Sequence, residues 1–214
     1  MSEKRVLVVN PNRDEACTAA IAATVAPLAR PGLLRFDVTA LADGPDAVTS
    51  WRDWHAVAGP LARVVETTPA DAYLIACVSD PAIDLLRSVT DRPVFGALRS
   101  GIAAALARAD RFGILAFVAA SVARQRRVLQ AMGAEARCVG ALPLDLPMAA
   151  LTAPEGARPR LAEVGRALAA QGADCLILGC AGMAGHRAWL EDEVGLPVVE
   201  PCQAAAALAA AALA

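Results

Sequence analysis

The sequence has few aromatic residues, only two histidines and no long uninterrupted apolar segment, although 57% of its residues are hydrophobic. A membrane-spanning helix requires an apolar run of about 18 residues, whereas the apolar stretches here are short and end at glycine, proline or charge. A secretory signal is also missing, because the apolar run after Lys4 and Arg5 stops at Asn10 and Pro11. We therefore expect a cytoplasmic protein that has no membrane partner.

The six cysteines lack both the spacing of a zinc site and the context of a disulfide framework. None belongs to a CxxC pair, and only His55 and His186 are available as imidazole ligands. Disulfide frameworks are typical of small secreted chains, and a chain of 214 residues is long enough to bury its own core. We therefore expect free thiols and no metal ion.

The chain also lacks an excess of positive charge, since its formal net charge is −2. Nucleic-acid-binding domains are typically strongly basic, so nucleic acid is not expected to be a partner. A local basic cluster at residues 124–127 is interpreted as the solvated face of a helix.

Short apolar runs alternate with helical patterns along the whole chain, which predicts an α/β fold with mainly parallel sheets flanked by helices. We expect strands at 6–9, 34–38, 73–76, 93–95, 112–117, 136–139, 175–178 and 197–199. We expect helices at 14–29, around 54–64, after Pro81, and at 98–107, 121–132, 160–171, 184–192 and the Ala-rich end. Ser79 or Asp80 should cap the helix that begins near Pro81, and residues 142–159 should form a long loop.

The two halves of the chain repeat each other. The segment 71–77 matches 174–180, and each of these apolar runs ends at a cysteine, Cys77 or Cys180. An internal repeat of this size predicts two lobes related by a pseudo-twofold axis. We place lobe 1 at residues 1–96 plus the C-terminal helix region and lobe 2 at 97–200. Together they would form one compact unit, 1–214, with the active site in the cleft between them.

Two opposed cysteines suit the removal of a proton from one face of a carbon and its return on the other. A thiol becomes an effective base when its anion is stabilised, for example by backbone amides at the start of a helix. The same amides can stabilise the oxygen of an enolate that forms when the carbon loses its proton. The other cysteines, Cys17, Cys138, Cys175 and Cys202, are interpreted as buried packing residues.

The motifs resemble those of the Asp/Glu/hydantoin racemase superfamily, and most closely those of the hydantoin and allantoin racemases. Asn10-Pro-Asn12 followed by Cys17-Thr18 is similar to the opening signature of that family. The segment 76–81, Ala-Cys-Val-Ser-Asp-Pro, resembles the first catalytic motif. The segment 178–184, Leu-Gly-Cys-Ala-Gly-Met-Ala, matches the second almost letter for letter.

This resemblance implies cofactor-independent racemisation of a small molecule by two bases, with Cys77 and Cys180 as the acid/base pair. It also implies a homo-oligomer. The residues expected to bind substrate are Asn10, Asn12, Val48, Val78, Ser79, Ala116, Phe117, Gly179, Ala181 and Gly182.

Departures from the family pattern concern the substrate more than the chemistry. Ala116 and Phe117 stand where the family commonly has two threonines, and Val48 stands where it often has isoleucine. The loss of two hydroxyls predicts a substrate with an apolar substituent, such as a 5-substituted hydantoin, over allantoin. Arg13 is interpreted as an exposed residue at a helix start, with binding of a substrate carboxylate as the alternative. His186 is interpreted as a surface or capping residue, with a proton relay as the alternative.

Two other classes of function remain open at this point. One is a cis–trans isomerase or decarboxylase of the same superfamily, although decarboxylases of this type typically keep a single cysteine. The other is a ligand-binding protein that has the fold but no activity.

Overall fold

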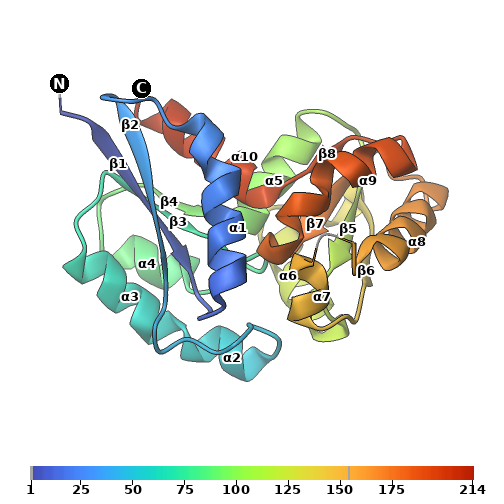
Figure 1. Ribbon diagram of the computed structural model, residues 1–214, viewed down its shortest axis with the longest axis horizontal. Coiled ribbons are helices and arrows are strands. Elements are labelled where there is room, and N and C mark those ends of the chain that lie inside the picture. The colour runs from blue at the N-terminus through green and yellow to red at the C-terminus, as the bar shows by residue number, and fades with distance from the viewer. Residues whose placement is uncertain (1, 154) are drawn as a thin grey trace.

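Two four-stranded parallel sheets form the framework of the computed structural model, which describes residues 2–153 and 155–214. The first sheet has the order β2-β1-β3-β4 and the second has the order β6-β5-β7-β8 (Figure 1). Their bounds are β1 (Lys4–Asn10), β2 (Leu34–Ala40), β3 (Ala72–Ile75), β4 (Val94–Gly96), β5 (Phe112–Ala116), β6 (Cys138–Pro143), β7 (Cys175–Gly179) and β8 (Val198–Val199). The identical strand order confirms the predicted α/β fold with two lobes.

Helices flank both sheets, and the first two α-helices begin at side-chain caps. Asp14 accepts the N–H of Cys17 at 2.6 Å, and Ser50 and Asp53 form a capping box. The α-helices are α1 (Glu15–Val25), α2 (Trp51–Ala56), α3 (Ala58–Thr67), α4 (Ile83–Ser88), α5 (Ala97–Leu106), α6 (Ala119–Ala131), α7 (Met148–Thr152), α8 (Arg158–Ala170), α9 (Arg187–Val194) and α10 (Pro201–Ala212). The 3₁₀ turns are η1 (Ala26–Leu28), η2 (Glu135–Arg137) and η3 (Ala181–His186). Within the described ranges, no helix is both long and apolar enough to cross a bilayer.

The predicted long loop at 142–159 is wrong in two respects. Strand β6 begins at Cys138 and continues to Pro143, because it pairs with β5 along its length. The short helix α7 then forms between Met148 and Thr152 and packs against η3 and α1. Five residues are too few to show a helical period in the sequence, so tertiary contacts stabilise this helix.

The predicted cap of the helix after Pro81 is also wrong. Helix α4 begins at Ile83, and its N-cap Ala82 makes no side-chain hydrogen bond. The carboxylate of Asp80 instead accepts the N–H groups of Leu98 and Arg99, each at 2.8 Å, at the start of α5. Gly96 is required there, because a Cβ atom at this position would lie 2.5 Å from the Asp80 carboxyl carbon.

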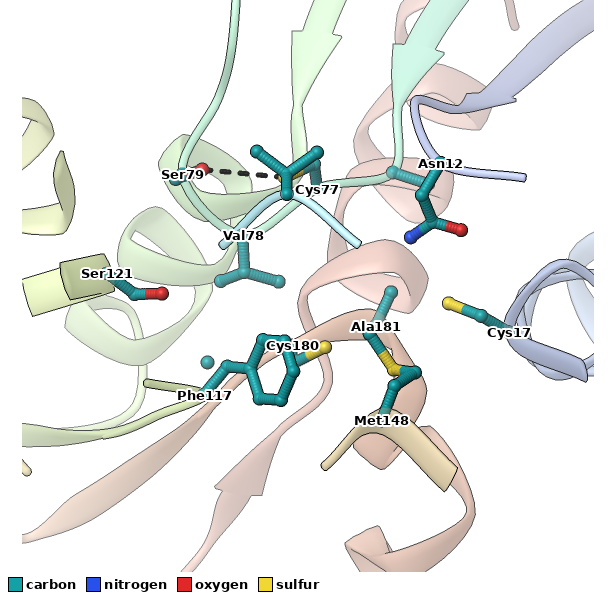
Figure 2. A pocket seen from close by; sticks show the side chains of 13 residues that line it. Asn12, Cys17, Cys77, Val78, Ser79, Phe117, Ser121, Met148, Cys180 and Ala181 are labelled. Atoms are coloured by element: carbon teal, nitrogen blue, oxygen red, sulfur yellow. Dashed lines mark hydrogen bonds between the residues drawn. The ribbon is translucent and has the colours of Figure 1, made fainter. Parts of the chain in front are cut away.

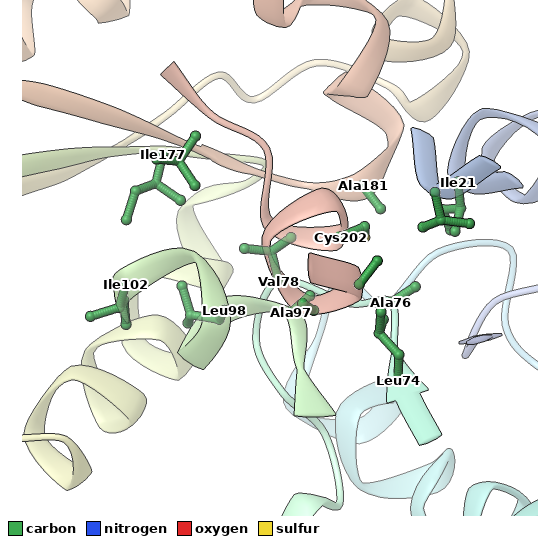
Figure 3. Close-up of a cluster of buried hydrophobic side chains, with 14 of the residues drawn as sticks. Ile21, Leu74, Ala76, Val78, Ala97, Leu98, Ile102, Ile177, Ala181 and Cys202 are labelled. Carbon is green, nitrogen blue, oxygen red and sulfur yellow. The ribbon is translucent and has the colours of Figure 1, made fainter. Parts of the chain in front are cut away.

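A continuous apolar core connects the two lobes. Helices α5 and α10 pack against each other at the junction between the sheets (Figures 1 and 3). Small residues allow this close approach: Ala97, Ala105, Ala205 and Ala206 are all fully buried. The Ala-rich end of the chain is therefore part of the core, and it fixes the carboxyl ends of the strands relative to one another.

Candidate active site

Cys77 and Cys180 line one pocket between the two lobes. Cys77 follows β3 by two residues, and Cys180 directly follows β7, the strand that has the matching place in the second sheet. Figure 2 shows Cys77 and Ser79 along one side of the pocket and Phe117, Cys180 and Met148 along the other. The repeat in the sequence thus brings two thiols from separate lobes to one cavity.

Each thiol has a hydrogen-bond donor two residues further along the chain. The Ser79 hydroxyl lies 3.4 Å from the Cys77 sulfur, and the backbone N–H of Gly182 acts to lower the pKa of Cys180. The indole of Trp54 donates to the Ser79 carbonyl at 3.0 Å and holds this segment in place. Both donors stabilise a thiolate over a thiol.

Burial raises the pKa of both thiols, and the neighbouring groups make the two pKa values differ. For Cys77, burial is opposed by the Ser79 hydroxyl and by the positive charge of Arg124, whereas the negative charge of Asp80 adds to the rise in pKa. For Cys180, burial is reinforced by the nearby thiol of Cys17, and its pKa is raised well above the ordinary value. Cys77 is therefore the more acidic of the two thiols.

Close backbone contacts explain the glycines around Cys180. A Cβ atom on Gly179 would overlap the Leu115 carbonyl and lie 2.8 Å from the Ala116 Cα of the adjacent strand. A Cβ atom on Gly182 would lie 3.1 Å from the Met148 sulfur. The second motif is therefore rich in glycine because β5 and α7 approach its backbone closely.

Most of the residues predicted to bind substrate line this pocket. They are Asn12, Val48, Val78, Ser79, Phe117, Gly179 and Ala181. Asn10, Ala116 and Gly182 lie behind the lining and support it. The Asn10 amide donates to Asn12 and Thr18, each at 2.9 Å, and Ala116 pairs with Gly179 in the sheet.

The structure also brings residues to the pocket that the sequence did not indicate. Met148, Cys17 and Ser121 all contribute to the lining. Met148 lies in the segment predicted to be a loop, and Cys17 was interpreted as a packing residue. Cys17 is indeed buried, and its pKa is raised to about 12 by burial and by the charge of Asp14.

Two further interpretations of polar residues are wrong. Arg124, assigned to a solvated face, is only 1% exposed and donates to the Val48 and Thr49 carbonyls, each at 3.2 Å. His186, assigned to the surface, is buried, and its Nε2 donates to the Leu151 carbonyl at 2.9 Å. By contrast, Arg13 is exposed and pairs with Asp46 at 2.7 Å, as expected for a residue at a helix start.

The pocket is small and mostly apolar. Its cavity volume is about 30 Å³, enough for only one or two water molecules, so lining side chains must move as a substrate enters. Within residues 2–153 and 155–214, no group of three His, Cys, Asp or Glu side chains is placed to hold a metal ion. The thiols of Cys17, Cys77 and Cys180 line the pocket.

Comparison with known proteins adds independent evidence. The model of the family "Asp/Glu/Hydantoin racemase" matches residues 6–209. The hydantoin racemase of Paenarthrobacter aurescens is 30% identical over 96% of this chain and 89% of its own length. The hydantoin racemase of Pseudomonas sp. (strain NS671) is 30% identical over 92% of this chain and 80% of its own length.

A solved structure agrees in fold. The allantoin racemase from Klebsiella pneumoniae superimposes with a TM-score of 0.91 at 26% identity, over 98% of this chain and 87% of that chain. The family match spans both sheets and both cysteine segments. The chain belongs to the Asp/Glu/hydantoin racemase family.

Proposed function

We propose that this protein is a cofactor-independent racemase that inverts 5-substituted hydantoins with Cys77 and Cys180 as its two bases. The observation that carries the proposal is that these two thiols come from equivalent strand ends of two lobes and line one pocket. A reaction that removes a proton from one face of a carbon and returns it on the other requires two such groups.

The proton transfers are as follows. The thiolate of one cysteine takes the proton from C5, forming an S–H bond as the C–H bond breaks. The electron pair moves into the adjacent carbonyl and forms an enolate. The thiol of the other cysteine then gives its proton to the opposite face of C5 and becomes the thiolate, and the roles exchange for the other enantiomer.

Backbone N–H groups in the η3 turn are available to stabilise the enolate oxygen. Cys180 is the N-cap of this turn, and the backbone N–H of Gly182 favours the thiolate form of Cys180. Preorganised donors of this type stabilise a developing negative charge, because they need no reorganisation during the reaction.

The apolar character of the pocket supports an apolar substituent on the substrate. Val48, Phe117 and Met148 contribute carbon and sulfur surface to the lining. Phe117 is only 6% exposed, and its ring offers no hydrogen-bond donor to a ureido group. Hydantoins with an alkyl or aryl group at C5 fit this surface better than allantoin.

The test uses single enantiomers of 5-alkyl and 5-aryl hydantoins, and of allantoin, in D₂O. We expect loss of optical rotation with incorporation of deuterium at C5, faster for the apolar hydantoins than for allantoin. A panel on which the protein catalyses neither exchange nor inversion would exclude this function.

The lobe boundaries, the homo-oligomer and the cytoplasmic location stay predictions from the sequence. Sedimentation equilibrium of the purified chain measures the oligomeric state directly.

A further inference from the structure

Gln125 connects the two segments that carry the cysteines. Its side chain is fully buried on α6, and its Nε2 donates to the Val78 carbonyl at 3.1 Å and to the Gly179 carbonyl at 3.4 Å. Val78 follows Cys77 in the chain, and Gly179 precedes Cys180. One side-chain amide therefore bonds to both lobes, immediately beside each thiol.

The orientation of this amide follows from its partners. Two carbonyl oxygens can only accept hydrogen bonds, so the NH₂ group, with its two donors, must face them. The Oε1 atom is then left buried without a hydrogen-bond partner among the described residues. A buried unpaired acceptor is destabilising, and an apolar side chain of the same size would avoid it.

The neighbouring Arg124 extends the same connection. Its guanidinium donates to the Val48 and Thr49 carbonyls of lobe 1 and, at 3.0 Å, to the Ser121 hydroxyl on its own helix. Val48 and Ser121 both line the pocket. The first half of α6 is thus bonded through two adjacent side chains to three segments around the cavity.

We propose that Gln125 is a positioning residue that sets the relative placement of Cys77 and Cys180, so that inversion follows proton removal. The proposal rests on the function given above. Proton transfer requires reacting atoms about 3–3.5 Å apart, and a misplacement of about 1 Å costs as much as 100-fold in rate. Without the amide bridge each thiol keeps its own chemistry, but the second thiol no longer lies correctly against the opposite face of the carbon.

This role predicts a specific uncoupling. In Gln125→Met, which keeps the volume and removes both donors, one cysteine still removes the proton, but the return on the other face is slow. The S–H of that cysteine exchanges with D₂O to S–D, and the deuteron is then given to the original face, so the recovered, uninverted hydantoin acquires deuterium. We expect the ratio of deuterium in recovered substrate to inverted product to rise at least about fivefold, with kcat about 10- to 100-fold lower and KM little changed.

The matched control is Gln130→Met. Gln130 is exposed on the same helix and bonds only weakly, at 3.4 Å, to Glu135. This variant should keep the wild-type ratio and rate. If Gln125→Met is slower but keeps the wild-type ratio, the loss is general and the positioning role is excluded. If Gln125→Met does not fold, Gln125→Glu, which keeps the side-chain length but loses the NH₂ group, provides the same measurement.

A second readout does not depend on the substrate. Crystal structures of the wild type and of Gln125→Met give the Cys77 Sγ to Cys180 Sγ distance directly, and we expect it to differ between the two. An unchanged distance overturns the positioning role. A wild-type protein that racemises no hydantoin overturns the proposed function instead, so the two failures are distinguishable.

Discussion

Cys77 and Cys180 occupy matching places in two sheets of the same strand order, yet the charge around them differs. Cys77 has the Ser79 hydroxyl and the Arg124 cation nearby, which favour its thiolate, and the Asp80 carboxylate, which disfavours it. Cys180 has the thiols of Cys17 and Cys77 nearby, and both disfavour its thiolate. The fold is symmetric and the electrostatics are not, so Cys77 should lose its proton more readily than Cys180.

Replacement of either cysteine by serine should have the largest effect. A serine hydroxyl is far less acidic than a thiol, so Cys77→Ser and Cys180→Ser should each lower racemisation by about 1000-fold or more. Each variant keeps one base and should therefore exchange the C5 proton of one enantiomer only. The preferred enantiomer should be opposite in the two variants, as measured by NMR in D₂O.

The matched control for these variants is Cys138→Ser, since Cys138 lies in β6 and is not among the residues that line the pocket within the described chain. It should keep full activity. Full activity in Cys180→Ser would contradict the two-base mechanism.

The strand ends and the two cysteines were predictable because their signals are local. A buried strand reads as a short apolar run, and the repeat of that run with its terminal cysteine indicates equivalent places in two lobes. Val78, Ser79 and Ala181 follow from the same reasoning, because they are chain neighbours of the cysteines.

The buried hydrogen bonds of Arg124 and Gln125 on α6, and the contribution of α7 to the pocket lining, were not predictable in this way. Arg124 and Gln125 are polar residues in a basic stretch, and only the approach of the other lobe buries them. Met148 and Cys17 reach the pocket through contacts of α7 and α1 with η3, which join elements that are far apart in the chain. Asp80 caps α5 instead of α4 for the same reason: its partners lie 18 and 19 residues away.

Arg124→Met should reduce the difference in pKa between the Cys77 and Cys180 thiols. The positive charge opposes the rise in the pKa of Cys77, so its loss should raise that pKa further. We expect activity at neutral pH to fall on the order of tenfold and the pH optimum to move to higher pH. In the wild type iodoacetamide should modify Cys77 faster than Cys180, and in the variant this preference should shrink, as peptide mass spectrometry measures.

Arg127→Met is the control for loss of a positive charge from the same helix, since Arg127 is exposed. It should leave the alkylation rate of Cys77 unchanged. A wild-type alkylation rate of Cys77 in Arg124→Met would show that the cation does not act on this thiol.

Substitutions in the walls of the pocket should have a smaller effect, and that effect should be on substrate selectivity. Phe117 lines the pocket, so Phe117→Thr should shift kcat/KM several-fold towards allantoin and away from 5-aryl hydantoins. Ala116 is fully buried and pairs with Gly179 behind the lining. Ala116→Thr should therefore leave selectivity unchanged and destabilise the fold by about 1–3 kcal/mol, because the added atoms overpack the core. Equal changes of selectivity in both variants would contradict this division.

Two buried carboxyls that cap helices can be compared in the same way as the two thiols. Their substitution should have the smallest effect, a change in how the free energy of unfolding depends on pH. Asp80 caps α5, and Glu200 caps α10 by accepting the N–H groups of Cys202 at 3.1 Å and Gln203 at 2.5 Å. Burial raises the pKa of Asp80 from 3.8 to about 6 and that of Glu200 from 4.5 to about 7. Both lobes thus contain a carboxyl that holds its proton more tightly in the folded state than in the unfolded state.

The sign of the pH dependence follows from this proton uptake. Between about pH 4 and pH 7 the folded chain binds more protons than the unfolded chain, so these carboxyls make the free energy of unfolding fall as pH rises, with no further change above pH 7. The effect is on the order of 3 kcal/mol for each carboxyl. Asp80→Asn should reduce the dependence of the free energy of unfolding on pH in the lower part of this pH range, and Glu200→Gln in the upper part. Urea unfolding at each pH measures both effects. Asp84→Asn, at a side chain that is 92% exposed, should keep the wild-type slope. A wild-type slope in both cap variants would mean that neither carboxyl is protonated in the folded chain within this range.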